Sequence, residues 1–105
     1  MSDPVLVYKG DEIAAYGFGD PHPFGTDRHD VFHRELAEAA LDDAIRYMPP
    51  RRASMDELLL FHMPEYIDKV SRMSKEGRGY LDDGDTPALP GIFDAACDVV
   101  GTTLA

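Results

Sequence analysis

Strand-forming segments are confined to the N-terminal end of the chain, and this shortage limits the folds open to it. The run VLVYKG, Val5–Gly10, is rich in β-branched and aromatic residues and ends at a glycine. The segment IAAYGFG, Ile13–Gly19, is a second candidate. One strand cannot form a stable sheet, and two or three are the most that this sequence offers. We therefore expect the chain either to pair its strands with another copy or to form the opening section of a larger α/β domain.

Apolar residues at three- and four-residue steps predict one long helix, Phe32–Met48, in the middle of the chain. Asp27 or Asp30 would lie near the positive end of its dipole, and Pro49–Pro50 would end it. The segment before this helix, Gly19–Asp30, is rich in glycine and proline. Such a composition predicts an ordered loop rather than a regular element.

Three further helices are indicated in the second half of the chain. Ser54 and Glu57 have the spacing of a capping box, so a short helix should begin at Met55. Pro64 favours the start of the next helix, and Gly77 is placed to end it in a left-handed conformation. A last helix is expected over residues 92–104, and no capping signal follows it. That lack favours the larger α/β domain over the paired copies.

The charge balance excludes several classes of function. The chain has 20 acidic and 10 basic residues, a formal net charge of -10, and no basic face that could attract a phosphate backbone. We therefore expect no nucleic-acid partner. The single cysteine, Cys97, excludes an internal disulfide, and the first residues lack the features of a secretory signal. No apolar run approaches the ~20 residues that cross a bilayer, so we expect no membrane partner and a cytoplasmic location.

The histidines suggest alternative sites. His29 and His33 are four residues apart on the predicted long helix, where both rings could face one metal ion, with a third ligand such as His22 or Asp30. The alternative is that they flank a solvated first turn. The His29-Asp30 pair also resembles that of metal-dependent phosphohydrolases, although the further ligands of that family have no convincing counterpart. Elsewhere, His62 is expected to cap or pack, and Cys97 to be a buried, unreactive thiol.

The stretch YLDDGDTPALPG concentrates three carboxylates, those of Asp82, Asp83 and Asp85. Three interpretations remain open from the residues alone. The carboxylates could bind a hard cation, although the oxygen pattern of a calcium loop is missing. Asp85, held by Gly84 and the nearby prolines, could instead accept hydrogen bonds from the N–H groups of a ligand. The third interpretation is a solvated, charged turn.

Three stretches together carry a family resemblance: YGFGDPHPFGTDR, RRASMDELLLFHMPEYIDKV and LDDGDTPALPGIFDAACDVVGTTLA. In this order they resemble the N-terminal portion of the histone deacetylase superfamily, and they are most similar to the bacterial acetoin-utilisation and acetylpolyamine-type deacylases. The resemblance implies the arginase/deacetylase α/β fold, a parallel sheet flanked by helices. Residues 1–105 would form a single partial domain of that fold, with one or two strands and about four helices.

The resemblance also implies a reaction, the zinc-dependent hydrolysis of an N-acetyl-lysine or acetylpolyamine amide. In the family, the tandem histidines, the zinc ligands and the catalytic tyrosine lie beyond the point that corresponds to Ala105. We therefore expect zinc in the full-length family but none bound to this chain alone, no catalytic residue among these 105, and no deacylase activity from them. The expected partners are an acetylated lysine or polyamine substrate and the missing C-terminal portion.

Individual roles follow from the same resemblance. Asp85 matches a rim aspartate that hydrogen-bonds the backbone of the substrate, and Arg28 matches an arginine of the internal channel behind the metal. His22 and Pro23 match the loop beside the active-site tunnel, and Phe24 would contribute to its wall. The family position of His62 is structural, while Asp82 and Asp83 are expected to be solvated or structural.

The sequence departs from the family pattern at two places. Asp20-Pro21 resembles an insertion, and Thr26 stands where many relatives have proline, so the rim and its substrate preference could differ.

The alternative function is that of a stand-alone, truncated interaction module. Such a module would use its exposed strand edge and uncovered helix faces to form a homo-oligomer or to bind a catalytic partner.

Overall fold

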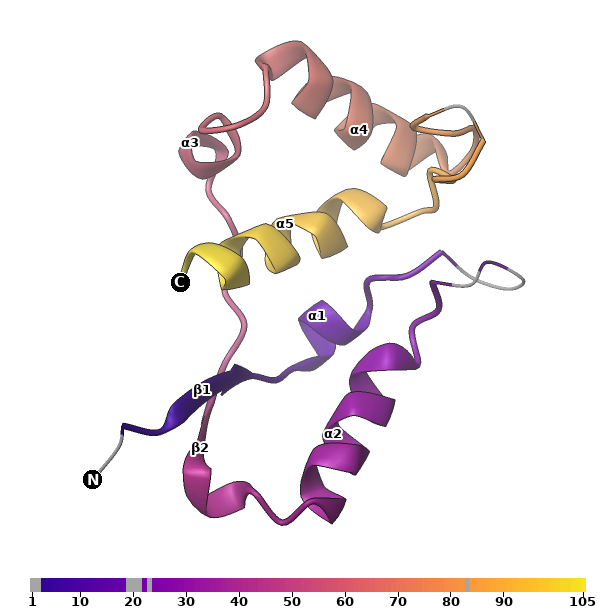
Figure 1. Ribbon diagram of the computed structural model, residues 1–105. Helices are drawn as coiled ribbons and strands as arrows, with labels where there is room; N and C mark the ends of the chain where they lie inside the picture. Colours follow the sequence, from indigo (N-terminus) through magenta and orange to yellow (C-terminus); the bar gives the residue numbers. More distant parts are fainter. Residues whose placement is uncertain (1–2, 19–21, 23, 83) are drawn as a thin grey trace.

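The computed structural model describes residues 3–18, 22, 24–82 and 84–105. These residues form two β-strands, five α-helices and one 3-10 turn (Figure 1). In chain order the elements are β1 (Val5–Tyr8), α1 (Asp11–Ala14), α2 (Arg28–Glu38), the 3-10 turn (Asp42–Ala44), β2 (Ile45–Met48), α3 (Met55–Leu58), α4 (Pro64–Glu76) and α5 (Ile92–Leu104). The α/β class predicted from the sequence is therefore confirmed.

The two strands pair in parallel within the chain. Val5 lies opposite Ile45 and Tyr8 opposite Met48, and the Lys9 amide extends the ladder by donating to the Met48 carbonyl at 3.0 Å. Parallel neighbours need a long crossover, and here α1, a loop and α2 supply it. The first strand therefore finds a partner within the chain, β2, along one of its two edges.

The predicted helix Phe32–Met48 is wrong in its second half. Helix α2 ends at Glu38, and Ala40 has a left-handed φ of 56° that stops it from continuing. Ile45 and Met48 are three residues apart, a spacing that suits one face of a helix, whereas in the observed strand they lie on opposite faces and each is partly buried. Because Met48 precedes a proline, its backbone favours an extended conformation, and pairing with β1 satisfies its hydrogen bonds.

The second strand predicted over Ile13–Gly19 is also wrong. Asp11–Ala14 form the single-turn helix α1, whose first turn carries two acidic residues near the positive end of the helix dipole. Gly10, just before this helix, packs against Pro50, and the ring of Pro50 leaves no room for a side chain at position 10. The residues from Tyr16 to Phe18 have no regular structure, and Gly19 lies outside the described residues.

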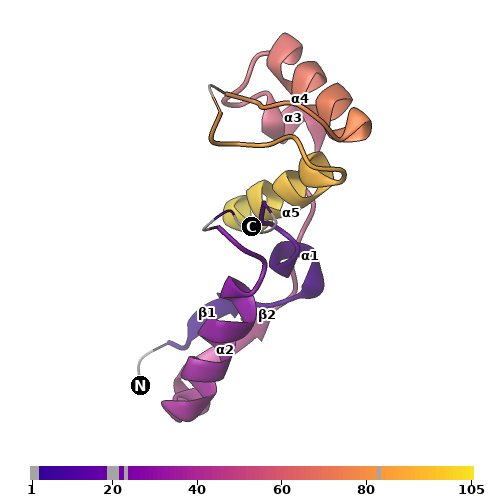
Figure 2. The same cartoon turned by 90° about the vertical axis from the view of Figure 1, so that its right-hand side faces the viewer.

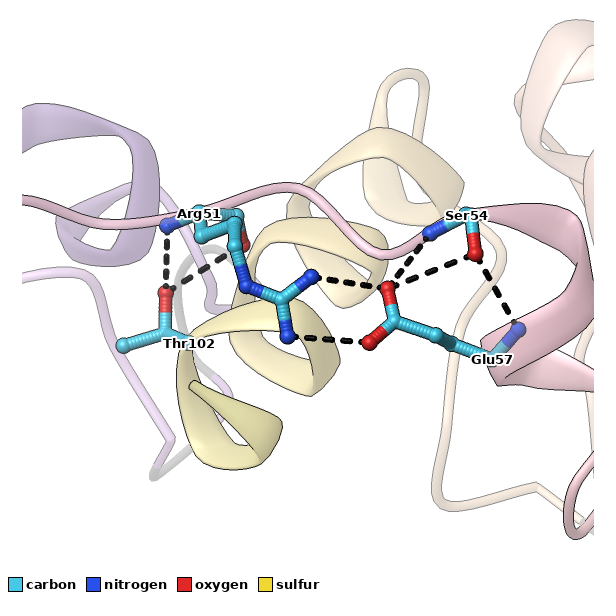
Figure 3. Close-up of polar contacts among 4 residues, drawn as sticks. All are labelled: Arg51, Ser54, Glu57 and Thr102. Carbon is cyan, nitrogen blue, oxygen red and sulfur yellow. Dashed lines mark hydrogen bonds and ion pairs between the residues drawn. The ribbon is translucent and has the colours of Figure 1, made fainter.

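The capping box predicted at Ser54 and Glu57 is confirmed (Figure 3). The Glu57 amide donates to Ser54 Oγ at 3.2 Å, and the Ser54 amide donates to Glu57 Oε1 at 3.0 Å. Arg51 adds a two-pronged ion pair to the same carboxylate, at 2.8 and 2.9 Å. Mainly through this contact with Arg51, the pKa of Glu57 falls to about 2. The start of α3 is thus fixed by residues within seven positions of one another.

Replacing Ser54 with alanine should lower the free energy of unfolding by about 1 kcal/mol, because the first-turn amide of Glu57 loses its acceptor. Ser54→Thr keeps a hydroxyl acceptor and is the matched control. Urea denaturation followed by circular dichroism measures both changes. Equal stability of the alanine and threonine variants would contradict a capping role.

The remaining helix boundaries follow the sequence. Pro64 is the first residue of α4, and Gly77 ends it with φ 70°. Helix α5 covers residues 92–104, as expected, and its Gly101 packs directly against the backbone of residues 51–53. The Ala53 amide donates to the Cys97 carbonyl at 3.0 Å. Figure 3 shows the neighbouring contact, in which the Arg51 amide donates to Thr102 Oγ1 at 3.1 Å. These contacts make α5 the centre of the molecule.

The core is small and the molecule is open. Its buried apolar centre consists of Ala53, Leu58, Ile67 and Cys97, against which Phe93 and Val100 pack. The strands and α2 form one end and α3 and α4 the other, with α5 between them (Figure 2). The radius of gyration is 15.8 Å, whereas a compact domain of this length has about 13 Å. The accessible surface is 7420 Å², against roughly 5,800 Å² for a compact chain of 11.6 kDa.

Much of this extra surface is apolar. Leu60, Phe61 and Met63, between α3 and α4, are 77%, 87% and 69% exposed. Val5 and Leu6 on β1 and Phe32 on α2 are also more than half exposed. None of the helices in the described ranges has both the length and the apolar character needed to cross a bilayer.

Candidate functional site

The acidic stretch forms a closed loop between α4 and α5. The Ala88 amide donates to the Gly79 carbonyl at 2.8 Å, and the Leu81 amide donates to the Thr86 carbonyl at 2.8 Å. Tyr80 lies opposite Pro87 in an isolated antiparallel bridge. These contacts close the base of the loop and place Asp82 and residues 84–86 at its tip.

Asp82 organises the tip of this loop. Its Oδ1 accepts from the amides of Gly84, Asp85 and Thr86 at 3.2, 2.9 and 2.9 Å. Its Oδ2 accepts from Thr86 Oγ1 at 2.6 Å. The bond from the Thr86 hydroxyl, followed by those from the amides, holds the pKa of Asp82 far below its usual range. Asp82 is therefore structural, one of the two roles expected for it, while Asp83 lies outside the described residues.

Asp82→Ala should loosen the loop, because three backbone amides and one hydroxyl lose a common acceptor. We expect the amides of Asp85 and Thr86 to exchange with solvent roughly tenfold faster, as measured by hydrogen exchange and NMR. Asp82→Asn keeps Oδ1 and is the matched control, with exchange close to that of the original chain. Unchanged protection in the alanine variant would contradict this role.

Asp85 has a backbone held by hydrogen bonds and an exposed carboxylate. Its amide donates to Asp82, and its carbonyl accepts from His22 Nε2 at 2.8 Å. The carboxylate itself is 92% exposed, and its Oδ1 lies 3.7 Å from His22 Nε2. The structure thus brings together two of the predicted rim residues, His22 and Asp85, from positions 63 residues apart.

A cavity of about 370 Å³ opens beside Asp85. Its walls include Phe18, Tyr80, Pro87 and Leu89, together with His22 and Asp85. Aromatic walls with one charged acceptor suit a ligand that has an apolar chain and donating N–H groups. Sequence reasoning missed Phe18 and Tyr80. Tyr80 begins the acidic stretch and could have been found from that position, whereas only the fold brings Phe18 close.

Arg28 faces a different cavity. This second cavity, of about 460 Å³, is lined by Arg28 and Phe24 and by Tyr8, Tyr16, His29 and His33. The Arg28 guanidinium carbon lies 4.1 Å from the centre of the Phe24 ring, within the range of a cation–π contact. Phe24 also packs edge-on against Tyr16 and Phe18, at 5.5 and 5.8 Å between ring centres.

The predicted channel and rim residues therefore fall into two groups. Arg28 and Phe24 line the larger cavity, and His22 and Asp85 line the smaller one, with Phe18 packed against both Phe24 and His22. The predicted rim residue Pro23 and the predicted insertion Asp20-Pro21 lie outside the described residues.

His29 and His33 do not flank a solvated turn, so that interpretation is wrong. Their ring centres are 4.4 Å apart, and the Gly10 amide donates to His29 Nε2 at 3.3 Å. His33 is only 8% exposed, and its Nδ1 is buried without a hydrogen-bond partner among the described residues. Burial, followed by the neighbouring His29 and Lys9, lowers the pKa of His33.

Cys97 and His62 have structural environments. Cys97 is 2% exposed, which confirms the predicted burial of its thiol. Burial raises the pKa of this thiol and so disfavours the reactive thiolate. The His62 ring packs against Tyr66 and Phe61, at 5.1 and 4.9 Å between ring centres. Helix α3 ends at Leu58, so His62 is not its cap, and packing is the role that the structure supports.

Comparison with known proteins identifies the family. Residues 22–105 match the model of the histone deacetylase domain. The chain belongs to the histone deacetylase family. This confirms the resemblance found in the sequence, and it places the parallel strand pair and helices in a partial histone deacetylase domain.

Individual relatives of this partial deacetylase domain are much longer. The chain is 33% identical over 111 residues to the acetoin utilization protein AcuC of Bacillus subtilis (strain 168), covering 99% of the chain and 28% of AcuC. It is 26% identical over 98 residues to the histone deacetylase HDAC1 of Drosophila melanogaster and to the probable histone deacetylase 1-B of Xenopus laevis. Both matches cover 86% of the chain, but only 19% and 20% of those proteins.

The described residues of this deacetylase domain do not fit a zinc ion. A protein zinc site needs three or four nitrogen, sulfur or oxygen ligands in tetrahedral array. Within the described ranges, no three side chains of histidine, cysteine, aspartate or glutamate are grouped to hold a metal. His29 and His33 are only two potential ligands, and His29 Nε2 already accepts the Gly10 amide.

His33 should make the stability of the domain depend on pH. Its folded-state pKa lies below the usual 6.5, so the unfolded chain binds more protons between these values. The stability that neutral His33 contributes is thus complete above about pH 6.5 and is lost as the pH falls toward the folded-state pKa. Urea denaturation between pH 7.5 and 5 should show a steeper loss for the original chain than for His33→Leu. Parallel pH curves would contradict the prediction.

Proposed function

We propose that this chain forms the N-terminal part of a zinc-dependent amidohydrolase domain that removes acetyl groups from lysine or polyamine amides. Within it, Asp85 and His22 belong to the substrate rim, Phe24 contributes to the wall of the active-site tunnel, and Arg28 belongs to the internal channel. The metal centre is supplied by polypeptide outside these 105 residues. Family membership supports the reaction class, and the open shape supports a domain completed by further structure.

The proposal rests mainly on the exposure of the Asp85 carboxylate on a backbone that hydrogen bonds hold in place. Its backbone is held from both sides, yet its carboxylate is 92% exposed at the mouth of an aromatic cavity. Such a carboxylate is ready to accept hydrogen bonds from the backbone N–H groups that flank an acetylated lysine. A hydrogen bond to a charged group contributes about 1.5–3 kcal/mol net of the bonds to water that it replaces, so such contacts would strengthen the binding of a peptide substrate.

Arg28 suits the handling of an anionic product. Amide hydrolysis releases a carboxylate, and a guanidinium can bind a carboxylate through two parallel hydrogen bonds. The Arg28 guanidinium lies over the face of the Phe24 ring. Its N–H groups therefore remain able to bind a carboxylate in the 460 Å³ cavity that both residues line. This arrangement is consistent with a channel that passes a small carboxylate.

A reconstitution experiment tests the proposal. The purified 105-residue chain is mixed with the part of AcuC that it does not match, and hydrolysis of an acetyl-lysine peptide is followed. We expect no turnover from either polypeptide alone and turnover from the mixture that is lost on chelation. A mixture without activity, or chelator-sensitive turnover by the chain alone, would contradict the proposal.

The exposed residues Leu60, Phe61 and Met63 favour a second candidate, a module that self-associates. Apolar side chains this exposed are typical of surfaces that another polypeptide covers. Size-exclusion chromatography with light scattering over a concentration series distinguishes the two. A dimer that persists on dilution supports the module, and a folded monomer at all concentrations rejects it.

A further inference from the structure

We propose that His22 is the positioning residue of the substrate rim: it fixes the Asp85 peptide so that the carboxylate faces the substrate. This inference rests on the proposed function, because it assumes that Asp85 binds the substrate backbone. It assigns to His22 a specific task that its location in the rim does not by itself imply.

The first step is that Asp85 is held at both of its peptide groups. Asp82 Oδ1 accepts its N–H at 2.9 Å, and His22 Nε2 donates to its C=O at 2.8 Å. With both bonds in place the direction of the Cα–Cβ bond is fixed, and only side-chain rotation remains. The carboxylate is 92% exposed and lies 3.7 Å from His22 Nε2, so it stays available to a substrate.

The second step is the protonation of the imidazole. The Phe24 amide donates to His22 Nδ1 at 3.0 Å, so this nitrogen carries no proton. In the neutral ring the proton is then on Nε2, where it can be donated to the Asp85 carbonyl. The Phe24 contact therefore selects the tautomer that the Asp85 contact requires.

The third step is that no local contact can replace His22. The loop at residues 79–88 belongs to the α4–α5 connection, whereas His22 belongs to the connection between α1 and α2. Asp82 orders the loop from within, but His22 ties it to the other wall of the cavity. Loss of this tie would leave the loop shape intact and let it shift relative to Phe18 and Phe24. Misplacement of a binding group by about 1 Å is enough to weaken substrate positioning strongly.

Two substitutions separate this role from a purely structural one. In His22→Gln the amide nitrogen is as many bonds from the backbone as Nε2, so it can still donate to the Asp85 carbonyl. In His22→Asn the side-chain oxygen takes the place of Nδ1, so it can still accept the Phe24 amide but cannot reach Asp85. Positioning of Asp85 requires the first contact, whereas a purely local role of His22 toward Phe24 requires the second.

The test uses the reconstituted mixture of the 105-residue chain and the remainder of AcuC, with an acetyl-lysine peptide. We expect His22→Asn and His22→Ala to raise KM about fivefold to tenfold with little change in kcat, because the lost interaction is one of substrate binding. His22→Gln should recover KM to within about threefold. The opposite order, with His22→Asn near normal and His22→Gln impaired, would overturn the inference.

Double variants distinguish failure of the inference from failure of the proposed function. In an Asp85→Ala background, His22→Asn should have no further effect on KM, because the group it positions is gone. If Asp85→Ala itself leaves KM unchanged, the proposed function of Asp85 fails. If Asp85→Ala raises KM but His22→Asn acts independently of it, only the inference fails.

A measurement on the 105-residue chain alone needs no turnover. Nitrogen-15 NMR of the imidazole should show the proton on Nε2 of neutral His22. The carbonyl carbon signal of Asp85 should shift in His22→Asn but stay near its original position in His22→Gln. A proton on Nδ1, or an Asp85 carbonyl that does not respond to His22→Asn, would overturn the inference.

Discussion

Gly101→Ala should destabilise the folded chain by about 3 kcal/mol, although alanine is the better helix former by about 1 kcal/mol. A Cβ atom at position 101 would overlap the backbone of Arg51, Arg52 and Ala53. Backbone atoms cannot rotate away as a flexible side chain can. Residues 51–53 would therefore have to move away from α5. Residues 51–53 would then lose the hydrogen bonds that their amides donate to the Cys97 carbonyl and to Thr102 Oγ1.

Urea denaturation followed by circular dichroism measures this effect, and Thr103→Val is its control. Thr103 is exposed on the same helix two residues later, and its hydroxyl donates only within this helix, to the Val99 carbonyl at 2.8 Å, among the bonds that the structure describes. A substitution there should therefore change stability by about 0.5 kcal/mol or less. The sign of the Gly101 effect is decisive. A stabilising Gly101→Ala would mean that helix propensity prevails and that α5 does not pack closely on residues 51–53.

Asp85→Ala should lower kcat/KM for an acetyl-lysine peptide by about 10- to 100-fold in the reconstituted mixture with AcuC. The substrate N–H groups lose a charged acceptor, a difference of about 1.5–3 kcal/mol, and each 1.4 kcal/mol is a factor of ten. The cost should appear mainly in KM, because the contact proposed for the carboxylate is with substrate groups away from the scissile amide. Steady-state kinetics with the purified mixture measure it.

The substrate and a control variant make the Asp85 prediction specific. An acetylated amine without flanking peptide groups offers no backbone N–H to Asp85, so its turnover should change by less than about threefold. Glu76→Gln, which removes an exposed carboxylate at the end of α4, should leave both substrates unaffected. An equal loss for the peptide and the small amine would indicate damage to the fold instead of a lost contact.

Sequence reasoning succeeded where a structure is determined by neighbouring residues. The capping box of Ser54 and Glu57 closes over three residues, and Pro64 and Gly77 act through their own backbone conformations. The opening strand was found because β-branched and aromatic residues are concentrated there. The parallel direction of the strand pair has no such local signature, and only the family resemblance predicted it.

The sequence did not predict the features of the structure that depend on residues far apart in the chain. The segment Ile45–Met48 has helical spacing and becomes a strand only because β1, forty residues earlier in register, pairs with it. The carboxylates of Asp82 and Asp85 are chemically alike in the sequence, but in the loop Asp82 accepts the backbone amides while the Asp85 carboxylate is exposed. The contact of His22 with Asp85 spans 63 residues, and no local pattern encodes it.

Hydrolysis of an acetyl-lysine peptide by the 105-residue chain, alone and mixed with the unmatched part of AcuC, tests the proposed substrate rim most directly. We expect no turnover by the chain alone, because in the proposed domain the metal centre is supplied by polypeptide outside these 105 residues. In the mixture we expect chelator-sensitive turnover that depends on Asp85. Turnover by the chain alone, or a mixture whose activity is indifferent to Asp85→Ala, would contradict a substrate rim completed by a separate metal centre.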